Sequence, residues 1–233
     1  MPGPYGGSYV GRMTEIAGTE VLPNRPSSTW LRIFARVYDP FLWLGELAGM
    51  RRLRSDLLRD AVGRVVEIGA GTGLNVEHYP DGIFELVLVE PDAAMRRRLA
   101  RRVRAAHIVD APAERLPLPD ASVDTVVSTL VLCTVDEPER ALREIARVLR
   151  PDGRLLFIEH VRASSRFLAA CQDHLLEPWR RFAGGCHCNR QTVELMGACG
   201  FEVTADSVAW RWMPPIVRPL MVGQATPLVT PAI

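Results

Sequence analysis

Five short apolar segments, separated by helical patterns, constrain the fold of this chain more than any other feature. The segments are residues 65–68, 86–90, 107–110, 123–129 and 154–160. Between them, apolar side chains recur every three or four positions, as at Met95, Leu99 and Val103, which is typical of an amphipathic helix. Apolar strands that alternate with helices predict a parallel sheet covered by helices on both faces.

Two more apolar segments follow, at residues 201–210 and 220–226. Seven strands predict a mostly parallel, Rossmann-like α/β sheet, and a chain of 233 residues is long enough for one such domain. We expect a single domain over residues 29–233. Residues 1–28 are rich in Gly, Pro, Ser and Thr, and we expect them to form a flexible N-terminal tail.

Helical patterns also surround the first strand. We expect an N-terminal helical cap over residues 29–60, with two helices that are broken near Pro40. A further helix is expected after Gly73, and it would end before Pro80.

Charge and cysteine content restrict the partners of the chain. The formal net charge of +1 gives no overall attraction to nucleic acid. Five cysteines are an odd number without a disulfide-like spacing, so we expect a reducing, cytoplasmic setting. Arg32, Arg36 and Asp39 interrupt the early apolar stretch, so we expect no membrane span. Peripheral contact with a membrane surface stays open, as does the choice between a monomer and a homodimer.

A glycine-rich turn follows the first strand, where "VVEIGAGTGLN" runs from Val65 to Asn75. It lacks the Gly-Lys-Ser/Thr end of a phosphate-binding loop, and its glycines do not fit the G-x-G-x-x-G dinucleotide pattern. Glu90 ends the second strand about 20 residues later, where a carboxylate can accept both hydroxyls of a ribose. These features predict a nucleoside cofactor. A tight turn that binds no ligand is the alternative.

Four segments occur in an order that is typical of a known family. They are "VVEIGAGTG", "VEP", "AERLPLPDASVDTVVSTLVLCTV" and "ALREIARVLRPDGRLLFIEH". Together they resemble the class I S-adenosylmethionine (SAM)-dependent methyltransferases of the type 11 group, over residues 38–160. The resemblance implies the class I methyltransferase fold, SAM as cofactor and S-adenosylhomocysteine as product. The tail of SAM would cross the glycine turn, where a Cβ would clash, near a helix N-terminus that favours its carboxylate.

The resemblance also implies which residues bind the cofactor. Glu67 and the glycines would shape the methionine end, Glu90 would hold the ribose, and Pro91 or Met95 would pack on the adenine. The implied set is Tyr38, Glu67, Gly69, Ala70, Gly71, Thr72, Gly73, Asn75, Glu90, Pro91, Met95, Ala113, Glu114, Thr129 and Leu130.

One position departs from the family pattern. Pro112 occupies the place where an adenine-contacting aspartate is expected, while Ala113 and Glu114 are retained. A backbone N–H of that loop could still serve, and Asp110 could substitute, although it lies two positions early.

The resemblance also implies that Thr129 and Leu130 line the sulfonium region, and that the N-terminal segment and a substrate-side insertion at residues 161–195 build the acceptor site. The segments "STLVLCTV", "EHV", "LEPWRRFAGGCHCNRQT" and "MVGQA" resemble, in order, the microsomal alkyl-thiol S-methyltransferases, whose membrane anchor we do not expect here. The resemblance implies methyl transfer to a small, fairly apolar molecule, with a thiol slightly preferred. His160 would act as a base or orient the acceptor.

Other interpretations stay open. An O- or C-methyltransferase for a quinone, phenol or lipid head group is one alternative, and a non-catalytic SAM-binding module is an alternative of another class. Cys186, His187 and Cys188 suggest a metal site. One C-x-C with a single histidine lacks the paired spacing of a zinc site, however, so we expect no metal.

Overall fold

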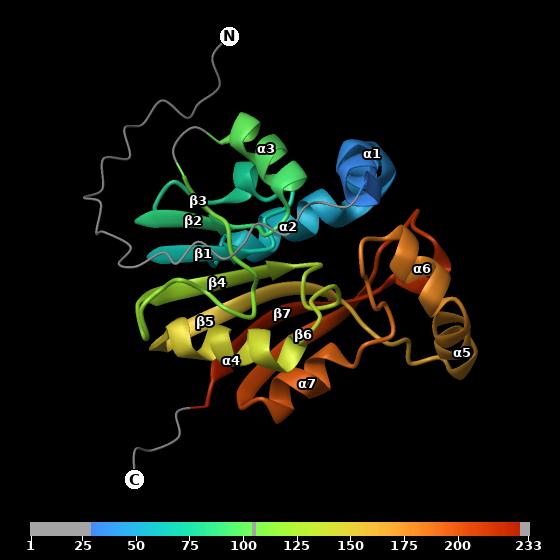
Figure 1. The fold of residues 1–233 in the computed structure, drawn as a ribbon. Coiled ribbons are helices and arrows are strands. Elements are labelled where there is room, and N and C mark those ends of the chain that lie inside the picture. The colour runs from blue at the N-terminus through green and yellow to red at the C-terminus, as the bar shows by residue number, and fades with distance from the viewer. Residues whose placement is uncertain (1–28, 104–105, 229–233) are drawn as a thin grey trace.

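A computed structural model describes residues 29–103 and 106–228, and the predicted tail at 1–28 lies outside the described residues. The described residues form a seven-stranded sheet with strand order β3-β2-β1-β4-β5-β7-β6 (Figure 1). The strands are β1 (Arg64–Ile68), β2 (Glu85–Val89), β3 (His107–Val109), β4 (Val123–Thr129), β5 (Leu149–His160), β6 (Phe201–Ala209) and β7 (Pro219–Pro227). Strands β1 to β5 are parallel, and β7 runs antiparallel to both β5 and β6. The predicted mostly parallel α/β sheet is therefore confirmed.

Helices cover both faces of this sheet (Figure 1). The α-helices are α1 (Thr29–Gly45), α2 (Arg51–Leu58), α3 (Ala93–Arg102), α4 (Pro138–Val148), α5 (Arg166–His174), α6 (Leu176–Phe182) and α7 (Thr192–Ala198). A short π-helix, η1 (Glu46–Met50), joins α1 to α2, and 3₁₀ turns form η2 (Val76–His78) and η3 (Pro215–Val217).

Strand β1 is largely apolar because successive side chains enter two different cores. Val66 packs in one cluster with Leu142 of α4, whereas its neighbour Val65 packs in another with Leu58 of α2. Side chains of a strand alternate between the two faces of a sheet, so a strand covered on both faces is apolar at most positions, and the buried Glu67 is an exception.

The break in the N-terminal cap is not where the sequence predicted it. Pro40 lies inside α1, and the chain turns instead at Gly49, whose φ of +133° interrupts η1. Glycine adopts this backbone conformation readily, and other residues rarely do. The predicted break near Pro40 is therefore wrong.

The helix predicted after the glycine turn is also wrong. Only the three-residue η2 follows, because Asn75 is buried and its side-chain amide donates to Glu67 and Thr129. Gly73 has a φ of +85°, which is outside the helical region. Consequently no α-helix begins at this turn, and no helix dipole is available there for a cofactor carboxylate.

Candidate cofactor and acceptor site

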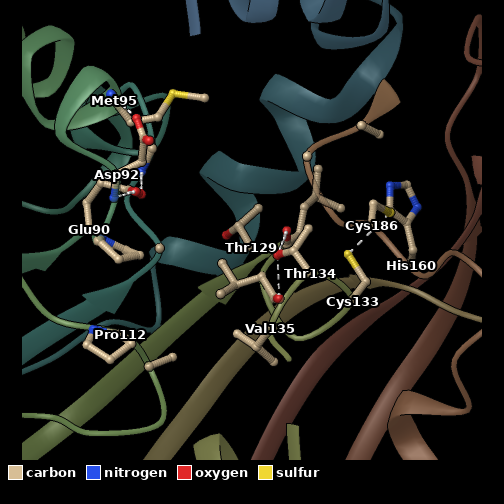
Figure 2. Close-up of a pocket in the computed structure, with 18 of the residues that line it drawn as sticks. Glu90, Asp92, Met95, Pro112, Thr129, Cys133, Thr134, Val135, His160 and Cys186 are labelled. Atoms are coloured by element: carbon tan, nitrogen blue, oxygen red, sulfur yellow. Dashed lines mark hydrogen bonds between the residues drawn. The ribbon is translucent and has the colours of Figure 1, made fainter. Parts of the chain in front are cut away.

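The described part of the chain contains a pocket of about 750 Å³ at the carboxyl ends of the parallel strands. Strand β1 lies between β2 and β4, so the strand order reverses beside the glycine turn, where α/β sheets usually bind ligands. Figure 2 shows Glu90 and Met95 on one side of this pocket and Cys133, Cys186 and His160 on the other, with Thr129 between them.

We call the two sides the cofactor half and the acceptor half. The cofactor half is lined by Gly69, Gly71, Glu90, Pro91, Met95, Pro112, Ala113 and Glu114. The acceptor half is lined by Cys133, His160, Trp179, Cys186, Trp210 and Met213. Thr129 and Leu130 lie between the halves, and α1 contributes Phe34, Tyr38, Phe41 and Leu42.

The three glycines of the turn serve different purposes. A Cβ on Gly69 would lie 2.6 Å from Val131, and one on Gly73 would lie 2.7 Å from Leu99, so packing excludes side chains at both positions. A Cβ on Gly71 would meet only the carbonyl oxygen of Gly69, at 3.8 Å. Gly71 has a φ of +57° and lines the pocket. It therefore leaves open space for a ligand, while the other two glycines allow the turn to pack.

Glu90 presents a buried carboxylate to the cofactor half, with only 6% of the residue exposed. Its Oε2 accepts a hydrogen bond from the Gly71 N–H at 2.8 Å, and its Oε1 accepts one from the Asp92 N–H at 2.7 Å. Burial raises the pKa of Glu90 to about 7. Each oxygen keeps a second acceptor site, because an ionised carboxylate offers about four in all.

Glu67 does not line the pocket, but it forms hydrogen bonds with residues that support it. Its carboxylate accepts hydrogen bonds from Asn75 at 3.0 Å and from the Tyr79 hydroxyl at 2.8 Å. Burial raises the pKa of Glu67 to about 7. Asn75 also donates to Thr129 and accepts from Arg54 of α2. This network connects the end of β1 to the end of β4 and to the N-terminal cap.

Contacts at the turn hold α1 over the cofactor half. Thr72 donates to Asp39 at 2.6 Å, and Arg102 of α3 donates to the same carboxylate at 2.5 Å. The adjacent Tyr38 lines the pocket, and burial raises the pKa of its hydroxyl, so that it is neutral. Ala70, Thr72, Gly73 and Asn75 are not among the residues that line the pocket.

Pro112, where the family pattern has an aspartate, lines the cofactor half. The carboxylate of Asp110 forms two hydrogen bonds with Arg96, at 2.5 and 2.7 Å, and Arg96 also donates to the Glu90 carbonyl oxygen. Asp110 itself lines the pocket, and Arg96 fixes the orientation of its carboxylate there. Ala113 and Met95 line the same side of the pocket.

His160 ends β5 in the acceptor half, with 5% of the residue exposed. Burial lowers the pKa of His160 to about 4, so the imidazole is neutral at pH 7. Its ring stacks on Trp210 at a centroid distance of 5.8 Å, and its Nδ1 has no hydrogen-bond partner among the described residues. The buried indole nitrogen of Trp210 also has no partner in this part of the chain. Buried polar atoms are usually paired, so these two fit a pocket that binds a ligand.

Several lining residues were not predicted as site residues, and Cys133 is the most informative of them. Its Sγ lies 3.7 Å from the Sγ of Cys186, and both thiols line the acceptor half (Figure 2). The position of Cys133, just beyond the carboxyl end of β4, was the available signal. Cys188 is buried and does not line the pocket. Within the described residues, no group of three or more His, Cys, Asp or Glu side chains could hold a metal ion.

Comparison with known proteins identifies the family. The sequence model of the family described as "Methyltransferase domain" matches residues 66–157. The chain is 35% identical to the thiol S-methyltransferase TMT1B of Rattus norvegicus, over 68% of this chain and 66% of that protein. It is 34% identical to TMT1B of Homo sapiens, over 72% of this chain and 73% of that protein. The chain belongs to the SAM-dependent methyltransferases.

Further comparisons agree on the fold and the cofactor of this methyltransferase. Demethylmenaquinone methyltransferase of Renibacterium salmoninarum is 33% identical over 53% of the chain and 52% of that protein. A SAM-dependent methyltransferase structure from Thermotoga maritima has a TM-score of 0.65 at 24% identity, covering 84% of this chain and 97% of that one. The class I methyltransferase fold is confirmed, and the cofactor is SAM. No helix in the described part of the methyltransferase is long and apolar enough to cross a membrane.

Proposed function

We propose that this methyltransferase transfers the methyl group of SAM to a small, fairly apolar thiol. One observation carries the proposal: the six residues named for the acceptor half include no carboxylate, lysine or arginine, and their imidazole, His160, is neutral at pH 7. Charged side chains of the loop after β4 and of α4 line the same pocket, at Asp136, Glu137 and Arg140, but none of them belongs to these six residues. An acceptor in this pocket must therefore reach its reactive anion with little help from a base. A thiol, with a pKa of about 8.5, does so more readily than a phenol, with a pKa of about 10.

The cofactor half supports SAM as its ligand. Glu90 has acceptor sites for both ribose hydroxyls, and the open space at Gly71 suits the methionine tail. Pro91, Met95, Ala113 and Glu114 would surround the adenine. Tyr38, Thr129 and Leu130 would line the sulfonium region, between the two halves.

The remaining predicted residues fit a supporting role. Glu67, Asn75 and Thr72 form hydrogen bonds that hold the turn against β4 and α1. Ala70 and Gly73 pack behind the turn, beside Leu99. These residues position the groups that would touch SAM.

When bound, SAM supplies an electrophilic methyl group on its sulfonium, and the neutral thioether of S-adenosylhomocysteine is the leaving group. The protein then has to align the acceptor, exclude water and keep the reacting groups close. The aromatic side chains of Phe41, Trp179 and Trp210 line the pocket and would help to exclude water once an acceptor is bound. With a pKa of about 4, His160 is a weak base at neutral pH, so we assign it to orienting the acceptor through its unpaired Nδ1.

A quinol or phenol is the second candidate acceptor, for O- or C-methylation. The same apolar walls would accept a flat ring, and a demethylmenaquinone methyltransferase is among the relatives. A lipid head group belongs to this alternative as well. A non-catalytic SAM-binding module is disfavoured, because the chain belongs to a family of enzymes.

Purified protein and SAM should be incubated with matched panels of alkyl thiols, phenols, quinols and lipid amines, with S-adenosylhomocysteine quantified by mass spectrometry. We expect product with apolar thiols and little with charged thiols such as glutathione. Turnover of phenols or quinols alone would overturn the thiol assignment and favour the second candidate. A His160→Gln variant run in parallel should raise the acceptor KM while SAM affinity stays unchanged.

A further inference from the structure

We propose that Cys133 and Cys186 form a reversible redox site in which a peroxide joins the two thiols as a disulfide. The two residues are 53 positions apart in sequence, yet their Sγ atoms lie 3.7 Å apart in the wall of the acceptor half (Figure 2). All five cysteines are free thiols in this structure. The thiol pair therefore has both partners and a route to solvent through the pocket.

The two loops that carry the thiols are already joined. The His187 N–H donates to the Cys133 carbonyl oxygen at 2.7 Å, and Arg190 donates to the Leu132 carbonyl oxygen at 2.6 Å. On the other side, the Cys133 N–H donates to the buried carboxylate of Glu159 at 3.2 Å. These contacts hold the backbones of both cysteines close together, as a disulfide requires.

Only a small movement separates the thiols from a bond. A disulfide needs a separation of about 2.05 Å, so the sulfur atoms must approach by roughly 1.7 Å. Cys186 follows Gly184 and Gly185, whose φ values are +62° and +102°. Glycines impose little steric restriction on a backbone adjustment, so the loop that carries Cys186 can supply the movement.

The chemistry balances with a peroxide as the oxidant. The Cys186 thiolate attacks the O–O bond, so an S–O bond forms, the O–O bond breaks and one oxygen leaves as water after protonation. Cys133 then attacks the Cys186 sulfur as a thiolate, the S–S bond forms and the second oxygen leaves as water. The two thiols together lose two electrons and two protons, and hydrogen peroxide gains both.

Exposure and hydrogen bonding favour Cys186 as the first thiol to react. Cys186 is 5% exposed, whereas Cys133 is 0% exposed. The hydrogen bond between the thiols lowers the pKa of Cys186 and raises that of Cys133. Cys188 is buried away from the pocket, and burial raises its pKa to about 12, so it competes poorly. We therefore expect oxidation to join Cys133 to Cys186 and not to Cys188.

The consequence for catalysis rests on the proposed function, although the disulfide itself does not. Drawing the Cys186 loop toward β4 would displace the acceptor-half wall that includes Trp179. A displacement of about 1 Å near reacting groups can reduce the rate by about 100-fold. Glu90 lies on the far side of Thr129 (Figure 2), and its carboxylate is held there by the Gly71 N–H, so SAM binding should be retained.

The test treats the full chain with hydrogen peroxide and follows it by peptide mapping and by activity. Trypsin should place Cys133 in peptide 116–140 and Cys186 with Cys188 in peptide 182–190. We expect a linked pair of these peptides, lighter by two hydrogens, in the wild type and in Cys188→Ser. The link should be absent from Cys133→Ser and Cys186→Ser. Cys199→Ser is the matched control, because Cys199 lies outside the pocket.

Methyl transfer should fall by about 100-fold on oxidation and return with dithiothreitol, while SAM affinity changes by less than about twofold. A disulfide between Cys186 and Cys188, or overoxidation of Cys186 without any link, would overturn the proposal. Loss of activity that persists in oxidised Cys133→Ser would also overturn it. The mapping needs no acceptor, so a wrong acceptor class would fail the substrate panel without affecting this result.

Discussion

Replacing Glu90 with glutamine tests the cofactor site most directly. The substitution keeps the shape of the side chain but replaces one acceptor oxygen with an N–H₂ donor. Glu90 accepts backbone hydrogen bonds at 2.7 and 2.8 Å, and both of its oxygens are placed to accept ribose hydroxyls as well. Loss of one hydrogen bond to a charged acceptor costs about 1.5–3 kcal/mol, so the SAM dissociation constant should rise about 10- to 150-fold.

The pH dependence of binding gives the same experiment a second readout. Burial raises the pKa of Glu90 to about 7, and hydroxyl donors favour the ionised form. Below this pKa, SAM must therefore displace a proton from Glu90. The affinity of the wild type should fall by up to about tenfold per pH unit below 7 and level off above it. Glu90→Gln has no ionisable group at this position, so its affinity for SAM should not vary with pH in this range.

Calorimetric titration of SAM at about pH 6, 7 and 8 would measure both effects, with thermal unfolding as a check on folding. Glu85→Gln is the matched control, because Glu85 begins β2, the strand that Glu90 directly follows, pairs with Arg64 and does not line the pocket. Binding by Glu90→Gln within about twofold of the wild type, or with the same pH dependence, would refute the ribose assignment.

Three further substitutions test the acceptor half and the structure that supports it. Gly45→Ala would place a Cβ 2.5 Å from the indole nitrogen of Trp210 and so displace this ring. We expect a higher acceptor KM with SAM affinity unchanged, and unchanged kinetics would contradict the assignment of Trp210 to the acceptor half. His160→Ala should reduce kcat while calorimetry shows normal SAM binding, and equal turnover would make His160 purely structural. The buried carboxylate of Glu159 accepts hydrogen bonds from Ser128 and from three backbone N–H groups, and an amide has only one oxygen to accept them. Glu159→Gln should therefore lower the free energy of unfolding by about 1–3 kcal/mol in urea titrations.

The sequence alone determined the sheet and the approximate place of the pocket that we propose for the cofactor. Strands buried on both faces are apolar at most positions, so segments such as 65–68 were recognisable without tertiary information. The carboxyl ends of parallel strands lie at one edge of the sheet, so Glu90 and the glycine turn were expected to meet there. The Gly71 to Glu90 hydrogen bond confirms that they do.

Local patterns were misleading where tertiary contacts outweighed them. The helix predicted after Gly73 is absent because the Asn75 amide forms hydrogen bonds with Glu67 and Thr129 instead. Glu67 and Glu90 are both buried glutamates beside the glycine turn, and the sequence does not distinguish their roles. The fold places Glu67 behind the turn and Glu90 in the wall of the pocket. Backbone propensity operates over a few residues, and these contacts join residues up to 54 positions apart.

The acceptor half was decided by tertiary structure almost entirely. Cys133 and Cys186 each look like an ordinary buried cysteine in the sequence, and nothing in their spacing of 53 residues predicts that they meet. They meet because the loop after β4 and the loop after α6 both return to the carboxyl edge of the sheet. A sequence specifies which strands are buried through the pattern of its apolar residues, whereas the side chains that face one another across a pocket are set by where the loops return.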